Sequence, residues 1–213
     1  MLFSAENHLE EISGIYVPFW LYSCESNGSF SFDATRTHHY TDGDYDVTET
    51  EHYLVLRDGE ARFNNIPVDG SSKMDDAYMD AIEPFDYSAI TDFHTDYLPG
   101  YAAQTYDEDA TACAPRATAR VKNTTIAAIR RTCDYTTLTP RTSKISTTQN
   151  SVDYALLPVW MLTTNWHGKS YHFAINGQTG KLIGDLPIDK GRFFSLLAGI
   201  TIPLGILLKL FIF

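Results

Sequence analysis

The sequence predicts an α+β fold, in which a duplicated antiparallel β unit has helices inserted between its copies and one C-terminal transmembrane helix follows. The first observation is an ordered motif set (Pro-x-Trp, an apolar strand starting with Tyr, a Gly turn and Pro-x-Asp) at residues 14–70 and again at 153–190. The second is a polar stretch with helical periodicity within residues 71–133. The third is the apolar segment 193–213, which leaves residues 1–192 as a β-rich domain.

The first copy is predicted to contain short strands joined by tight turns. Residues 15–24 form an apolar run rich in β-branched and aromatic side chains, which is typical of a buried strand. Residues 25–28 (Glu-Ser-Asn-Gly) have turn composition, and residues 29–39 alternate as a second strand does. A third strand over 47–57 then meets Asp58-Gly59, which predicts a hairpin turn.

The second copy repeats this order. Residues 171–177 match residues 53–59, so a hairpin turn is expected at the glycine of each. The Pro-x-Asp exits at residues 66–69 and 186–189 close the two copies. The sequence therefore predicts two superimposable β units.

Two helices are predicted between the copies. The first begins at Ser72, with Asp75 as its capping partner. The second follows the acidic residues 107–109, which suit a helix N-terminus, and runs to Arg131. Residues 149–151 are then expected to turn into the second copy.

Charge and cysteine content exclude several classes of protein. A formal net charge of -11 repels phosphate backbones, so direct nucleic-acid binding is not expected. Cys24, Cys113 and Cys133 form no CxxC pair, which excludes a zinc knuckle and a disulfide framework within the chain. We expect three buried free thiols in a reduced compartment.

The C-terminal segment predicts a single-pass membrane protein whose partner is the lipid bilayer. Residues 193–213 match the thickness of a hydrocarbon core, and Lys209 is the one charge within them. Lys190 and Arg192 precede the segment, and residues 1–11 do not resemble a signal peptide. The large N-terminal domain is therefore expected on the cytoplasmic side of the cell membrane.

Several sequence blocks, including GIYVPFWLY, IPVDGSSKM, YALLPVWML and NGQTGKLIGDLPIDKG, resemble a family of bacterial membrane proteins with an N-terminal TFIIB-type zinc ribbon. The resemblance covers nearly the whole chain from about Gly14. It implies a zinc cofactor only if two CxxC pairs lie upstream, because the ribbon is absent from this sequence. It implies no particular activity.

The candidate metal ligands gather near one predicted loop. Three carboxylates alternate in it as in a calcium loop, but Val47 and Tyr53 replace the required Gly and Glu. Three histidines flank it and could join them at a transition-metal site, although exposed histidines on a hairpin are the commoner cause of such a pattern. The candidates are His38, His39, His52, Asp42, Asp44 and Asp46.

No catalytic or cofactor-binding set is predicted. Residues 177–181 (Gly-Gln-Thr-Gly-Lys) have two residues between their glycines where a phosphate loop has four, so a hairpin turn is favoured. Trp20 and Trp160 could line a shared pocket, but core packing is the simpler explanation. The resulting hypothesis is a non-enzymatic binding, scaffold or sensor module. The alternatives are a metal-dependent enzyme using the His and Asp candidates, and a transcription-linked role through an upstream ribbon.

Overall fold

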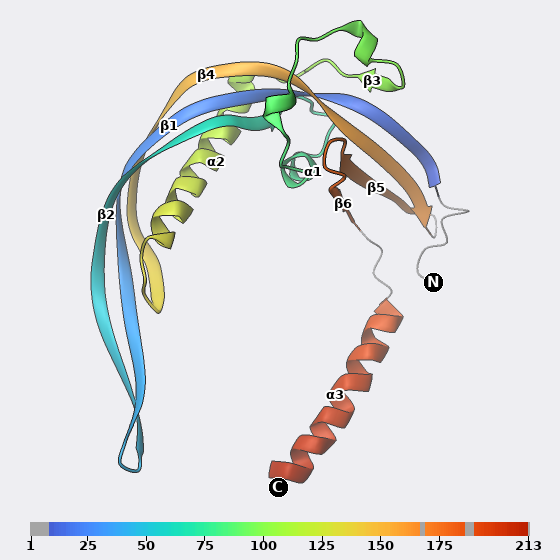
Figure 1. The fold of residues 1–213 in the computed structure, drawn as a ribbon. Coiled ribbons are helices and arrows are strands. Elements are labelled where there is room, and N and C mark those ends of the chain that lie inside the picture. Colours follow the sequence, from blue (N-terminus) through green and yellow to red (C-terminus); the bar gives the residue numbers. More distant parts are fainter. Residues whose placement is uncertain (1–8, 167–168, 186–189, 213) are drawn as a thin grey trace.

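A long, twisted, mainly antiparallel sheet dominates the computed structural model, which describes residues 9–166, 169–185 and 190–212. The strand order is β2-β1-β4-β5-β6, and β3 pairs in parallel with β1 at Gly14–Tyr16. The sheet curves around helix α2 (Figure 1). The strands are β1 Leu9–Asp42, β2 Tyr45–Asp69, β3 Tyr101–Ala103, β4 Thr137–Trp166, β5 Lys169–Asn176 and β6 Leu182–Gly184. The predicted α+β class with an antiparallel sheet is confirmed.

Within the described residues, three α-helices accompany the sheet: α1 Asp76–Ala81, α2 Ala110–Arg131 and α3 Lys190–Ile212. Asp75 is itself the N-cap of α1, so the helix starts later than the predicted Ser72. Asp109 caps α2 by accepting a hydrogen bond from the Ala112 amide at 2.8 Å, and α2 ends at Arg131 as predicted. The connector between α1 and α2 holds two short 3₁₀ helices, Tyr87–Ala89 and Thr95–Tyr97.

Three predicted turns are wrong, because the strands run straight through them. Residues 25–28 lie within β1, Asp58-Gly59 within β2, and residues 149–151 within β4. Residues 149–151 instead lie at a change of register, where Ser23 pairs with Ser151 and Cys24 with Gln149. A bulge of this kind bends a strand without ending it. The hairpin turn between β1 and β2 lies at the acidic tip, where Gly43 has φ +63°.

The segments that match in sequence occupy different positions along their strands. Gly59 lies in mid-strand, whereas its counterpart Gly177 begins the turn that follows β5. Trp20 pairs with Val68 near the end of β2, but Trp160 pairs with Ile175. The matching segments therefore pair with their neighbouring strands at different positions. The second Pro-x-Asp exit at 186–189 lies outside the described residues.

The two tryptophans nevertheless lie on strands, and each is half-buried against tyrosine rings from other segments. The Trp20 ring lies 5.0 Å from that of Tyr106, and its indole N–H donates to the Glu108 carbonyl at 2.9 Å. The Trp160 ring lies 5.1 Å from that of Tyr101. Both rings thus pack against the connector that precedes α2.

The core divides between the two faces of the sheet. On one face Val17, Phe19 and Leu21 pack with Leu157 and with α1. On the other face a second set packs against α2. This set comprises Tyr22, Cys24, Ile66, Val68, Cys113, Ala117 and Val121. Alternation of side chains along each strand explains why one strand serves both clusters.

Gly59 lets α2 approach the sheet near the C-terminal end of the helix. Gly28 of β1 pairs with Gly59 of β2, and a Cβ atom at Gly59 would overlap the Ile129 side chain of α2. A side chain here must displace Ile129, which explains glycine in mid-strand.

We expect Gly59→Val to lower the free energy of unfolding by about 1–3 kcal/mol, as overpacking does. Adding Ile129→Ala should restore much of the loss, because it removes the clashing atoms. The measurement is urea unfolding followed by tryptophan fluorescence. The matched control is Asp58→Val, whose side chain lies on the opposite, exposed face and should change stability by under about 0.5 kcal/mol. A Gly59→Val loss that Ile129→Ala leaves unchanged would contradict this explanation.

Helix α3 stands away from the sheet (Figure 1). Within the residues that the structure describes, no helix has both the length and the apolar character needed to cross a membrane. The predicted spanning segment at residues 193–213 is therefore unsupported.

Candidate binding surface

The outer face of β1, β2 and β4, opposite α2, presents exposed polar side chains. Ser26 points inward, is 2% exposed, and has its hydroxyl 2.6 Å from the Thr125 hydroxyl of α2. Its neighbours Glu25 and Asn27 point outward and are exposed. The same alternation continues along β1, so one side of these strands is packed and the other is uncovered.

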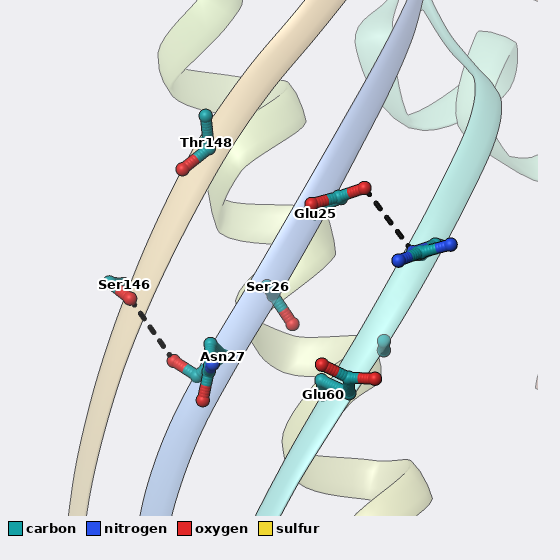
Figure 2. A pocket seen from close by; sticks show the side chains of 8 residues that line it. Glu25, Ser26, Asn27, Glu60, Ser146 and Thr148 are labelled. Atoms are coloured by element: carbon teal, nitrogen blue, oxygen red, sulfur yellow. Dashed lines mark hydrogen bonds and ion pairs between the residues drawn. The ribbon is translucent and has the colours of Figure 1, made fainter.

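A shallow hollow of about 240 Å³ lies on this outer face (Figure 2). Figure 2 shows Glu25, Asn27, Glu60 and Ser146 around it, with α2 behind the strands. The Arg62 Nε atom lies 3.2 Å from Glu25 Oε1, and Ser146 donates to the Asn27 carbonyl at 3.3 Å. Exposed ion pairs of this kind contribute about 0–1 kcal/mol, so a polar ligand could replace one partner at low cost.

Hydroxyl groups extend the polar surface towards the β1–β2 hairpin. Thr35 and Thr137 have their hydroxyl oxygens 2.6 Å apart, as do Ser31 and Thr142. These hydroxyls bond to one another across the strands. The chemistry of the surface is therefore hydrogen bonding and charge pairing.

The structure separates the predicted histidine ligands. His38 lies 3.8 Å from Glu51, and His39 has Nδ1 3.0 Å from the Thr48 hydroxyl. As neighbours in one strand, these two rings point to opposite faces. His52 pairs with Thr35, four positions along the ladder from His39, which corresponds to about 13 Å. The three rings therefore do not converge.

The predicted acidic loop is present at the hairpin tip, and its carboxylates also diverge. Asp44 lies at the tip, Asp42 pairs with Tyr45, and Asp46 accepts a hydrogen bond from Thr41 at 3.2 Å. Successive ladder positions place Asp42 and Asp46 on opposite faces. In the described part of the chain, no group of three or more His, Cys, Asp or Glu side chains could hold a metal ion.

Sequence reasoning missed a charge cluster between β2, α1 and α2, which surrounds the buried Asp69. Arg116 Nη2 donates at 3.0 Å to Asp69 and to Asp80, and Arg116 Nη1 lies 2.7 Å from Asp76. Asp69 is 1% exposed, and its second oxygen has no hydrogen-bond partner. Burial raises the pKa of Asp69 to about 6, against the opposing effect of the Arg116 charge.

A second arginine extends this cluster one turn along α2. Arg120 donates to Glu83 at 2.8 Å and to the Pro67 carbonyl. The sequence signal that could have found the cluster is a pair of arginines four residues apart on one helix face, together with the Pro-x-Asp exit of β2. Its members join three elements, so the cluster holds the fold together at this point.

The cysteine prediction is confirmed for two of the three thiols. Cys24 and Cys113 are buried, whereas Cys133 is only partly buried. Burial raises the pKa of Cys24, and burial with the nearby Glu108 raises the pKa of Cys113 to about 11. Neither buried thiol is therefore a nucleophile at neutral pH.

The loop that superficially resembles a phosphate loop has a structural role. Asn176 is 1% exposed, and its side-chain amide donates to the carbonyls of Ile82 and Pro84 at 3.0 and 2.9 Å. Its carbonyl oxygen accepts from the amides of Gln178 and Thr179 at 2.8 and 3.0 Å. The loop therefore binds the segment that follows α1, and the favoured hairpin turn is confirmed.

Comparison with curated proteins finds a similar protein in Bacillus subtilis (strain 168), the uncharacterised protein YdjG. The two are 37% identical over 209 residues. The match covers 98% of this chain and 61% of YdjG, so the chain spans about three fifths of that relative's length. No family model matches the chain, and no solved structure matches it.

Proposed function

We propose that the chain is a non-enzymatic binding module that α3 attaches to a lipid bilayer. The observation that carries this proposal is the exposure of the large apolar side chains of α3, each 46–66% exposed to solvent. They are Phe193, Phe194, Leu196, Leu197, Ile200, Ile202 and Leu204.

The arrangement of these side chains favours lipid over a single protein groove. Phe194 and Ile202 lie away from the Leu197–Leu204 side of the helix, so the apolar surface is spread around it. Each large apolar side chain that leaves water contributes roughly 1.5–3 kcal/mol. Several such groups on one helix provide enough free energy to hold a domain at a membrane.

The polar outer face of the sheet is the proposed binding surface. Helix α2 supports its strands from behind, and a ligand could replace partners in its exposed ion pairs and hydroxyl contacts. The enzyme alternative required His38, His39, His52 and the acidic tip to meet in one site. Their placement on opposite faces of a hairpin favours binding instead.

Membrane attachment is tested by fractionation of cells that express the full chain. We expect the protein in the membrane fraction, resistant to high salt and to alkaline carbonate. Leu197→Asp with Ile200→Asp should move it to the soluble fraction, because two charges then face the hydrocarbon. The matched control is Ser195→Ala with Thr201→Ala, which should remain in the membrane fraction. Release of the unmodified protein by salt or carbonate would refute the proposal.

The cytoplasmic orientation is part of this proposal and has a separate readout. Protease added to intact spheroplasts should leave the exposed tip around Asp44 uncut, whereas lysis should expose it. Cleavage in intact spheroplasts would place the domain outside the cell. The resemblance to zinc-ribbon membrane proteins remains a prediction, as does a transcription-linked role through an upstream ribbon.

A further inference from the structure

Strand β2 forms a long free edge of the sheet. It extends over 25 residues and pairs with β1 on one side. Within the described residues no strand pairs with its other side between Tyr45 and Phe63. In Figure 1 it is the outermost strand at the left rim. A free edge presents unpaired N–H and C=O groups that another strand can bind.

Two large apolar side chains stand beside this edge. Leu54 and Leu56 lie on the outer face and are 57% and 65% exposed. The Arg57 side chain donates to the Leu56 carbonyl at 2.9 Å, so this carbonyl accepts a bond from outside the β1–β2 ladder. Because backbone direction alternates, Leu54 and His52 also present their N–H and C=O groups to the free edge.

We infer that β2 pairs antiparallel with β2 of a second copy of this chain, around a two-fold axis at Leu54. Leu54 then lies opposite its own copy, and Leu56 lies opposite His52 of the other chain. The two Leu54 side chains meet at the axis, and one Leu56 lies on each side of them. Apolar surface on both chains therefore leaves water at the junction. The two sheets become one continuous sheet, and each free β2 edge is paired.

The charges on β2 select this register. With Leu54 on the axis, Arg57 lies opposite Glu51 and Arg62 lies opposite Asp46, and no like charges face each other. Opposite charges at directly facing positions stabilise a strand pair, and like charges destabilise it. Arg57 can leave the Leu56 carbonyl, because that carbonyl then accepts a bond from the backbone of the facing strand.

Neighbouring symmetric registers match less well. Moving the axis to Tyr53 places Arg57 opposite Glu49 but also places Glu60 opposite Asp46, which are both acidic. Moving it to Val55 places Arg57 opposite Tyr53 and Arg62 opposite Thr48, so both charge pairs are lost. The local charge pattern therefore favours Leu54 at the axis, although the net charge of -11 repels the chains as a whole.

Disulfide cross-linking tests both the pairing and its register. The full chain carries Cys133→Ser, because Cys133 is the native thiol that is not fully buried. In this background Leu54→Cys places two thiols opposite each other, within the range of a disulfide. Leu56→Cys places the equivalent thiols four residues apart along the ladder, at about 13 Å, which is beyond that range.

We expect mild oxidation to convert most of the Leu54→Cys protein to a covalent dimer and little of the Leu56→Cys protein. Mixing His52→Cys with Leu56→Cys should give a heterodimer that neither forms alone, because these positions face each other.

Light scattering in nonionic detergent should show a dimer for the unmodified chain and a monomer for Leu54→Lys. Equal cross-linking of Leu54→Cys and Leu56→Cys, or a monomer for the unmodified chain, would overturn the inference.

Discussion

Arg116→Ala is expected to lower the free energy of unfolding at pH 7 by about 3–5 kcal/mol, because it leaves the buried Asp69 carboxylate without its partner. Asp76 and Asp80 would also lose Arg116 as a partner, and their negative charges would then repel that of Asp69. Arg62→Ala is the matched control. Its ion pair with Glu25 is exposed, so its loss should cost at most about 1 kcal/mol. Urea unfolding of the full chain in mild detergent measures both.

The pH dependence separates this explanation from a loss of packing. Asp69 has a pKa of about 6 in the folded chain, above its ordinary value, so protonation favours the folded state as pH falls from 7 to 5. Removing Arg116 removes an influence that lowers this pKa, so protonation of Asp69 should relieve part of the Arg116→Ala defect at pH 5. A defect that is equal at pH 7 and pH 5 would show that the charge pair is not its cause.

Two carboxylates whose pKa is lowered in the folded chain, Asp86 and Asp107, do not obscure this measurement. Hydrogen bonds from Ser88 lower the pKa of Asp86, and hydrogen bonds from Ser72 lower the pKa of Asp107. Both groups are therefore ionised in the folded and the unfolded chain between pH 5 and pH 7. They contribute to the change in stability only at lower pH, where their unfolded forms begin to bind protons.

Asn176→Ala is expected to cost about 2–4 kcal/mol, because it removes four hydrogen bonds at a buried position and leaves their partners unpaired. Asn176→Asp keeps the two bonds that the side chain accepts and loses the two that it donates. At pH 7 it should be at least as destabilising, since a carboxylate then faces the carbonyls of Ile82 and Pro84.

The Asp variant should recover stability as pH falls, because the protonated carboxyl can donate again, whereas the Ala variant should not. Asn27→Ala on the exposed outer face serves as the control and should change stability by under about 0.5 kcal/mol. The measurement is the same urea unfolding. A small effect for Asn176→Ala would show that water replaces its hydrogen bonds.

Elements whose formation depends on neighbouring residues were predicted correctly from the sequence. The cap at Asp109, the end of α2 at Arg131 and the turn after Asn176 all depend on residues within one turn of chain. The predicted turns were wrong where glycine is present for another reason. Gly59 resembles a turn residue, but a Cβ atom there would overlap Ile129 of α2, which comes from a distant part of the chain; at Gly28 a Cβ atom would meet the Phe30 ring and the Lys144 carbonyl.

The candidate sites could be predicted less well, because they depend on pairing between distant residues. His38 and His39 are neighbours in sequence, and strand alternation separates them. Asp69 and Arg116 are 47 residues apart, and only the packing of α2 against the end of β2 brings them together. The outer face, likewise, combines β1 and β2 with β4, whose place beside β1 no local motif encodes.

The pairing of β1 with β4 has a consequence for how the chain reaches its native state. Thr35 and Thr137 face each other although 102 residues separate them, and the ladder continues from there to Leu9 and Thr164. Contacts of such long range require closure of a large loop before they stabilise anything, so folding is expected to be slow. During synthesis β1 must wait for β4 to emerge from the ribosome. Until then its apolar residues are available to chaperones, which makes the newly made chain a candidate client of them.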